Sequence, residues 1–292
     1  GVQTCALPIL LITSGRAEAA LVELQALQAD PALSPRQRHQ VLQEQANALS
    51  MMGRHAESLP RLRQLLADVP ASDPRRRQRA LNLLSRNSYW AGELDDARDQ
   101  VQQLLDLSRS LGDAVAEASA LFRLGVLDRE RGRIDEAVAC LQAAADLARR
   151  EGHVETLRSA LSTLATVRLD RLQLAAAEAL IVEGEQASPW WESPSLEDVY
   201  DDRRYRLHHL RGEVDAAWAV LERSLQRHQH HDDLHSELGT CLQTVDLALA
   251  TNDTAGARRR LDAAVALHAR TGADSLQDRK STRLNSSHRL TS

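Results

Sequence analysis

The stretch that decides the fold is GVLDRERGRIDEAVACLQAAADLARR, residues Gly125–Arg150, together with the ALFRL that precedes it. Apolar residues recur there at three-to-four-residue spacing, which predicts one helix ending at Gly132 and a second starting near Asp135. The two apolar stripes consist of Leu121, Leu124, Val126 and Leu127, and of Ala137, Leu141 and Ala144. One hairpin cannot bury both stripes, so copies of the same unit are expected beside it.

The same spacing recurs along the chain at steps of 38 to 40 residues. Each copy has a turn residue, a small residue five positions later and an aliphatic residue nine positions later. The turn residues are Gly15, Gly53, Gly92, Gly132, Leu172, Gly212 and Asn252. The small residues are Ala20, Ser58, Ala97, Ala137, Ala177, Ala217 and Ala257, and the aliphatic ones are Leu24, Leu62, Val101, Leu141, Ile181, Leu221 and Leu261. The pattern predicts an all-α chain of about seven helix hairpins.

Each of the three positions has a physical reason. Glycine or asparagine at the end of a helix takes a left-handed conformation at little steric cost. The small residue lets the second helix approach the first closely, and the aliphatic residue one turn later fills the seam between them. Between hairpins, Ser34 is expected to cap a helix that has Pro35 at its first position, and Asp113 is expected to cap another.

The segment LFRLG, followed by G-R-I-D-E-A and a leucine four residues later, resembles a tetratricopeptide repeat. The resemblance covers about Leu10–Gln277, and it implies a right-handed superhelical solenoid whose concave groove is lined by the first helix of each hairpin. Its step is longer than the usual 34 residues, which is similar to the long repeats of bacterial signalling proteins and of maltose-regulator-type transcription activators. The fifth unit departs from the pattern at Leu172, and the sixth departs at Asp201, Arg204 and Tyr205.

The two ends are antisense to each other. Codons that encode DRKSTRLNS, residues 278–286, give GVQTCALPI, residues 1–9, when their complement is translated, and the DNA resembles a sequencing adapter. Lys280, the only lysine of the chain, lies in this tail. We therefore expect residues 1–9 and 278–292 to be artefacts, and residues 10–277 to be a solenoid fragment that is cut within a repeat at both ends. The arginine-only remainder suggests a bacterial source.

Charge and cysteine content narrow the function classes. The net charge is −5, and it becomes −8 when residues 278–292, with four basic side chains and one acidic one, are set aside. An acidic chain is a poor candidate for a nucleic-acid surface. No apolar stretch has the length of a membrane span. Cys140 and Cys241 lie at least two units apart, so no disulfide is expected and a cytoplasmic location is predicted.

No motif indicates catalysis. The chain lacks a phosphate-binding glycine loop, a G-x-S-x-G turn, an H-E-x-x-H helix and paired C-x-x-C sequences, so we predict a protein that is not an enzyme and uses no cofactor. His231 and His235, within HQHHDDLH, have the spacing of metal ligands on a helix. Helix ending and capping explain this segment without a metal, and no metal site is predicted.

The resemblance places a partner in the groove, which implies binding residues on the first helices of units two to four. They are Asn47, Arg79, Asn82, Arg86, Tyr89, Phe122, Val126 and Arg129. Arginines can hold a carboxylate in two-pronged geometry, amides can bond an extended backbone, and aromatics can anchor a partner. The alternative is that Arg79 and Arg86 pair with acids on adjacent helices. The corresponding face of units five to seven offers Ser162, Thr166, Asp202, Arg206 and Asp246, with less basic character.

Trp190 and Trp191 form a second candidate site. They lie in Gly184–Ser195, the least regular segment of the chain, and adjacent tryptophans on a helix cannot both enter one core. A hydrophobic plug over unit six is the alternative. The sequence thus predicts a protein-interaction scaffold, the sensory or interaction region of a larger bacterial signalling or regulatory protein, with a protein or peptide as partner. The alternative function is a small-molecule effector-binding domain of a transcription regulator.

Overall fold

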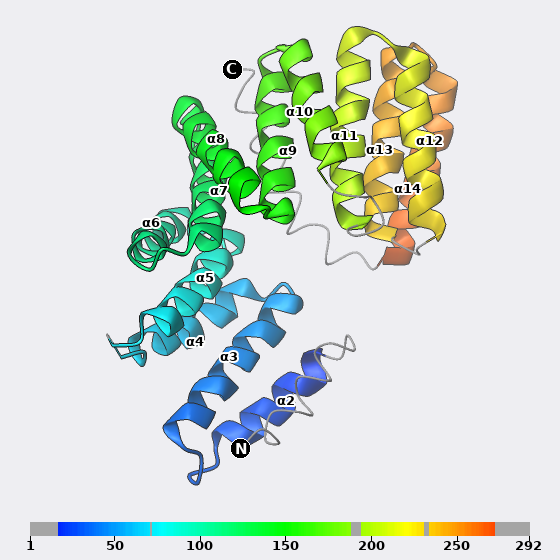
Figure 1. Ribbon diagram of the computed structural model, residues 1–292. Helices are drawn as coiled ribbons and strands as arrows, with labels where there is room; N and C mark the ends of the chain where they lie inside the picture. The colour runs from blue at the N-terminus through cyan, green and yellow to red at the C-terminus, as the bar shows by residue number, and fades with distance from the viewer. Residues whose placement is uncertain (1–16, 71, 188–193, 231–233, 272–292) are drawn as a thin grey trace. The chain divides into compact units, whose positions relative to one another are not determined.

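The computed structural model describes residues 17–70, 72–187, 194–230 and 234–271, and within these ranges it contains thirteen α-helices and no strand (Figure 1). The all-α prediction is confirmed. The helices are α2 (Ala17–Gln28), α3 (Pro35–Met51), α4 (His55–Ala67), α5 (Pro74–Trp90), α6 (Leu94–Ser110), α7 (Ala114–Glu130), α8 (Ile134–Glu151), α9 (Val154–Asp170), α10 (Leu174–Gln186), α11 (Pro194–Arg211), α12 (Val214–His230), α13 (Leu234–Ala250) and α14 (Thr254–Thr271).

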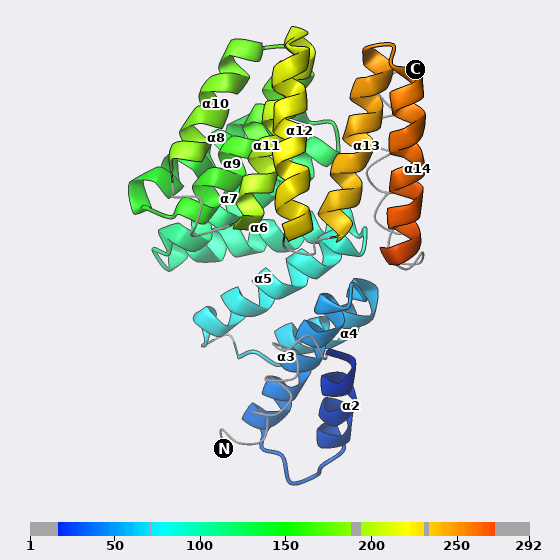
Figure 2. The ribbon, with the colours of Figure 1, turned by 90° about the vertical axis from the view of Figure 1, so that its right-hand side faces the viewer.

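These helices form six antiparallel hairpins, α3–α4 to α13–α14, and α2 is the second helix of the first predicted unit. Figure 2 shows the pair α13 and α14 side by side. The chain divides into two compact units, with α2–α8 in the first and α9–α14 in the second. The predicted end segments, residues 1–9 and 278–292, lie outside the described residues, so their origin remains a prediction.

Every predicted turn residue within the described ranges is left-handed. The φ angles are 74° at Gly53, 82° at Gly92, 74° at Gly132, 55° at Leu172, 74° at Gly212 and 62° at Asn252. The next residue closes the helix end with a backbone hydrogen bond, as from the Arg133 N–H to the Asp128 carbonyl at 2.9 Å. Leu172 makes the same turn without glycine's freedom, since the Gln173 N–H reaches the Arg168 carbonyl at 2.9 Å. A left-handed leucine costs roughly 1 kcal/mol.

The seam between paired helices is as predicted. Ala20, Ser58, Ala97, Ala137, Ala177 and Ala217 are fully buried, and Ala257 is 4% exposed. The aliphatic residues from Leu24 to Leu221 are buried as well. Leu221, for example, lies in one core cluster with Tyr205 of α11 and Leu247 of α13. Leu261 is the exception at 41% exposure. It lies on α14, the last described helix.

Both predicted helix caps are present. The Ser34 hydroxyl accepts the Gln37 N–H at 3.3 Å, and the Gln37 side chain accepts the Ser34 N–H at 2.9 Å, which makes a complete capping box before Pro35. The Asp113 carboxylate accepts the Ala116 N–H at 3.1 Å. These caps begin α3 and α7, the first helices of their hairpins.

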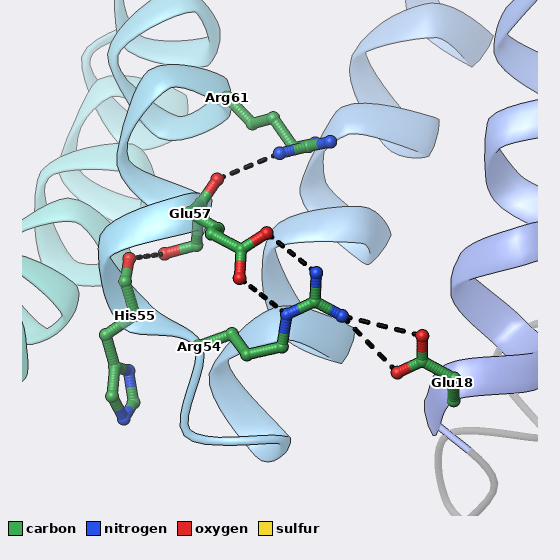
Figure 3. A network of polar contacts seen from close by, with 6 residues as sticks. Glu18, Arg54, His55, Glu57 and Arg61 are labelled. Atoms are coloured by element: carbon green, nitrogen blue, oxygen red, sulfur yellow. Dashed lines mark hydrogen bonds and ion pairs between the residues drawn. The ribbon is translucent and has the colours of Figure 1, made fainter. Parts of the chain in front are cut away.

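Surface ion pairs add little to this framework. Arg54, beside the turn before α4, holds Glu57 at 2.6 Å and reaches Glu18 of α2 at 3.4 Å (Figure 3). The Arg61 guanidinium donates to the Glu57 carbonyl at 2.8 Å. Arg54 and both carboxylates are more than one-third exposed, and such pairs contribute little to stability in water. The hairpins therefore depend on their packed seams.

In the first unit, α7 and α8 approach most closely at Gly125. A Cβ atom at this position would lie 2.6 Å from Leu141 Cγ and 3.1 Å from the Ala137 carbonyl oxygen. The equivalent residues of the other hairpins, seven positions before the turn, are small in Ala46, Ser85 and Ala165 but large in Tyr205 and Val245. The seams of the last two hairpins are consequently built differently.

In the second unit, polar and aromatic side chains replace the usual apolar ones of α11. Asp201 is 8% exposed, and its carboxylate accepts from Ser224 at 2.8 Å and pairs with Arg227 at 2.5 Å. Arg204 forms a two-pronged ion pair with Glu185 of α10. Tyr205 packs against the apolar residues of α12 and α13. The departures from the repeat pattern are thus accommodated by paired charges.

Part of the predicted irregular segment 184–195 is helical, because Gly184–Gln186 still belong to α10 and Pro194 and Ser195 begin α11, and residues 188–193 lie outside the described residues. Gly184 is a packing residue. A Cβ atom there would lie 1.9 Å from the Tyr200 hydroxyl, which donates to the Arg158 carbonyl at 2.7 Å. The absence of a side chain at position 184 makes room for this buried tyrosine.

His39 and Arg76 link α3 to α5. His39 is 8% exposed, its Nε2 accepts from Arg76 Nε at 3.0 Å, and its Nδ1 has no partner among the described residues. Burial, followed by the charge of Arg76, lowers the pKa of His39 below its ordinary value of 6.5, while Asp68 and Asp73 act in the opposite direction and Arg79 in the same one. The folded protein therefore keeps this imidazole neutral.

Substitution of Gly125 by alanine should destabilise the first unit. Overpacking a close helix contact costs about 1–3 kcal/mol, which exceeds the roughly 1 kcal/mol that alanine gains over glycine within a helix. Gly239 of α13 is the matched control, because a Cβ atom there meets nothing within 4 Å. In urea unfolding followed by circular dichroism, Gly125→Ala should lower the midpoint and Gly239→Ala should raise it. Equal shifts in one direction would contradict the close contact.

Protonation of His39 should lower stability at acid pH. Because its pKa is depressed in the folded state, the unfolded chain binds more protons below about pH 6.5, and the free energy of unfolding falls as the pH decreases through this range. His39→Gln keeps an acceptor for Arg76 but does not titrate. Melting temperatures between pH 8 and pH 5 should decrease less in the variant than in the wild type. Parallel pH profiles would show that His39 titrates normally.

Candidate functional site

The predicted binding residues lie on α3, α5 and α7, the first helices of three successive hairpins in the first unit. We call this set the first-helix face: Asn47, Arg79, Asn82, Arg86, Tyr89, Phe122, Val126 and Arg129. Arg79, Asn82 and Arg86 are exposed, and the other five are half-buried. All eight side chains are thus at least partly accessible to solvent.

Neither Arg79 nor Arg86 forms an ion pair or a hydrogen bond with the described residues. The alternative that they pair with acids on adjacent helices is therefore wrong for the part of the chain that the structure describes. This separates them from most arginines of the unit, such as Arg133, whose Nη2 lies 2.6 Å from the buried Asp128 carboxylate. Arg75, which is also exposed on α5, pairs with Asp113 at 3.2 Å, whereas Arg79 and Arg86 have no such partner among the described residues.

Arg123 of α7 adds a third positive charge that was not predicted. Its Nη1 donates to the Asn82 carbonyl at 3.1 Å and to Ser85 Oγ at 3.3 Å, so the side chain reaches across to α5. Burial and the neighbouring charge of Arg86 lower the pKa of Arg123 to about 10. No carboxylate pairs with it among the described residues. Burial without a counter-charge makes this guanidinium a favourable place for an anion.

The sequence contained a signal for Arg123. It lies between Phe122 and Leu124 in the LFRL segment, so a helical period puts it at the edge of the apolar stripe. The sequence does not show where the Arg123 side chain points, because an arginine at the edge of an apolar stripe can extend into solvent or reach the preceding helix. The contact with Asn82 is a tertiary one across 41 residues.

Two of the predicted binding residues already have partners within the chain and are therefore less available to a bound peptide. Arg129 is paired with Glu130 at 2.8 Å, and the Asn47 amide donates to Glu44 at 3.2 Å. The charge of Arg129 is consequently compensated locally. Among the described residues, the positive charges without an acidic partner on or beside the first-helix face are therefore Arg79 and Arg86, which belong to it, and Arg123, which lies next to Phe122.

An aromatic group lies at the end of α5. Tyr89, which was predicted, contacts Trp90 edge-on at a centroid distance of 5.2 Å, and Trp90 stacks on His55 at 6.0 Å. Trp90 was not predicted, although it is 60% exposed. The ring of His55 is held in turn by the buried Asn87, whose Oδ1 lies 3.0 Å from His55 Nδ1. Aromatic side chains that are held in place and exposed are effective anchors for a partner.

Two charged residues of the corresponding face of the second unit are paired internally, and its Asp246 is exposed. Arg206 pairs with Asp170 at 2.6 Å, and Asp202 binds Arg203 at 2.7 Å and accepts from Gln243 at 2.5 Å. Ser162 and Thr166 are buried. The weaker basic character that the sequence suggested for this face therefore results from ion pairing as well as from composition.

The remaining predictions are not tested. Trp190, Trp191 and His231 lie outside the described residues, and so does the side chain of His235. Within the described ranges, no three histidine, cysteine or acidic side chains are close enough together to hold a metal ion. No helix in these ranges has the length and apolar character needed to cross a membrane. Cys140 and Cys241 are free thiols.

Comparison with known proteins bears on the fold. Residues 76–150, which span α5 to α8, match the family model described as tetratricopeptide repeat. No curated protein matches the sequence. Among solved structures, the apo form of RapI is similar with a TM-score of 0.70 and 12% sequence identity, and the match covers 91% of this chain and 97% of RapI.

Two further structures share the fold at low identity. Aspartyl phosphate phosphatase F from Bacillus subtilis has a TM-score of 0.65 and 8% identity, and the match covers 89% of this chain and 68% of that one. The Rap conjugation gene regulator of plasmid pLS20, solved in complex with the Phr* peptide, has a TM-score of 0.60 and 14% identity over 90% and 72% of the two chains. Together with the left-handed turns and the small-residue seams, these matches show that the chain has the fold of the tetratricopeptide-repeat proteins.

Proposed function

We propose that this chain is a protein-interaction scaffold that binds a peptide segment on the first-helix face of its first unit. The observation that carries the proposal is the lack of any acidic partner for Arg79, Arg86 and Arg123 among the described residues. Guanidinium groups without counter-charges, next to half-buried Phe122 and Tyr89, suit a segment with both carboxylate and apolar side chains. The pLS20 regulator, a fold neighbour, was solved with a peptide.

The partner is expected to be acidic. Arg86 and Arg123 repel each other, and the charge of Arg86 adds to the effect of burial in lowering the pKa of Arg123. A carboxylate placed between them removes this repulsion and forms charge-assisted hydrogen bonds. Nucleic acid is a weaker candidate because the chain has a net charge of −5.

We infer a bacterial signalling or regulatory context and no catalysis by this region. The fold neighbours support the context, and the scarcity of convergent titratable groups on the first-helix face supports a binding role. Aspartyl phosphate phosphatase F shares the fold alone. The second candidate function, an effector-binding domain of a transcription regulator, is favoured by a single feature of the second unit, the buried Arg158.

The test uses the whole chain. Once a pull-down supplies a partner segment, Arg79→Ala with Arg86→Ala should weaken its binding by about 2 kcal/mol or more in calorimetry. The melting temperature should not fall, because neither arginine has a partner to lose among the described residues. Arg123→Gln should weaken binding too, since glutamine keeps an amide for the Asn82 carbonyl and lacks the charge.

Arg150 of α8 and Arg259 of α14 provide the control. Both are exposed, lie on second helices and have no ion-pair partner among the described residues. Replacing both by alanine removes the same total charge and should leave the affinity unchanged. If the Arg79/Arg86 variant binds as well as the wild type, the first-helix face is not the site, and the segment around Trp190 and Trp191 becomes the next candidate.

A further inference from the structure

Arg158 of α9, in the second unit, is a buried cation without a counter-ion. Its exposure is 3%, and neither Nε nor Nη1 has a hydrogen-bond partner among the described residues. No described carboxylate forms an ion pair with it. The other deeply buried charges behave differently, since Asp128 is held by Arg98 and Arg133, and Asp201 by Arg223 and Arg227.

Tyr200 of α11 packs against the Arg158 side chain. Its ring lies under the guanidinium, with 5.3 Å from Cζ to the ring centroid, and its hydroxyl donates to the Arg158 carbonyl at 2.7 Å. Gly184 of α10 leaves room for the hydroxyl. Because its hydroxyl is bonded to α9 and its ring is buried, the tyrosine gives the guanidinium a rigid aromatic surface to rest on.

Ser162, one turn along α9, is the second polar group without a partner. It is 2% exposed, and its Oγ makes no hydrogen bond with the described residues. A helical serine usually bonds to the carbonyl four residues earlier, which here is that of Arg158. That carbonyl already accepts the Tyr200 hydroxyl. The serine hydroxyl and the guanidinium thus remain as neighbouring unused donors on one helix.

Nearby acids do not neutralise this pair. The carboxylates that influence Tyr200 are Glu185 and Glu183. Glu185 is engaged by Arg204 in two hydrogen bonds, and neither glutamate forms an ion pair with Arg158 in the described part of the chain. A buried charge without a partner is strongly unfavourable, and each buried unsatisfied donor adds to the cost. Such an arrangement is explained most simply by a bound anion.

We propose that Arg158 and Ser162 form a binding site for a small oxyanion, a carboxylate or a phosphate, against the ring of Tyr200. A guanidinium offers parallel N–H donors that match two oxygens of either group, and the serine hydroxyl supplies a further donor. The site lies in the second unit and goes beyond the peptide-binding proposal for the first. It would give this chain a means of responding to a small anionic ligand.

The experiment measures melting temperature and binding of the whole chain at constant ionic strength, with chloride replaced stepwise by phosphate or by succinate. The melting temperature of the wild-type protein should rise to a plateau with at least one of the two anions. A rise with phosphate identifies a phosphate ligand, and a rise with succinate identifies a carboxylate ligand. Arg158→Met should melt at a higher temperature than the wild type without added anion, since it removes an uncompensated buried charge. It should not respond to either anion.

Two further variants keep the proposal falsifiable if Arg158→Met fails to fold. Ser162→Ala retains the charge and should bind the responding anion about tenfold more weakly by calorimetry. Arg259→Met, at an exposed position of α14, should respond as the wild type does. The proposal is overturned if neither anion stabilises the wild type more than chloride does, or if Ser162→Ala and Arg158→Met respond as strongly as the wild type.

Discussion

The close approach of two antiparallel helices at one small residue is the constraint on which the rest of this structure depends. Alanine or serine at that position is buried in every hairpin, and the left-handed turn five residues earlier sets the angle at which the second helix returns. Larger side chains would separate the helices and leave the aliphatic residue of the next turn without a filled seam. Because each hairpin buries its stripe against its neighbours, the repeat is the unit of stability within each compact unit.

Because the hairpins are held together by these packed seams, one face of each first helix is not required for packing within its hairpin. In the second unit, Arg206 on this face pairs with Asp170 and Asp202 pairs with Arg203, so this face has no unpaired arginine comparable to Arg79 among the described residues. In the first unit, Arg79, Arg86 and Arg123 are not compensated, and Arg123 is drawn toward Asn82 and Ser85 even though Arg86 is a like charge. The like charge of Arg86 opposes this placement of Arg123, and the proposed peptide carboxylate would relieve the repulsion.

Arg158 is likewise an arginine without an acidic partner among the described residues, but it is buried. Tyr200 needs Gly184 for space and bonds to the Arg158 carbonyl, which would otherwise be the usual acceptor of the Ser162 hydroxyl. The arrangement contrasts with Asp201 in the same unit, where burial is accompanied by a serine and two arginines. Burial with partners is a structural solution, whereas burial without partners points to a ligand.

The sequence by itself determined the helix class, the repeat step, the left-handed turns and the buried small residues. Those properties follow from local periodicity and from glycine-type turns, which depend on residues within one repeat. The resemblance to the tetratricopeptide repeat, carried along by the repeat spacing, also selected Arg79 and Arg86, and both are exposed. The tertiary structure decided which charges are paired, since Arg206 finds Asp170 across 36 residues and Arg123 finds Asn82 across 41. The sequence carries no local record of such contacts. It likewise could not show that Tyr200 would enter the space above Gly184 and leave Arg158 alone, because that outcome depends on three helices meeting at one point.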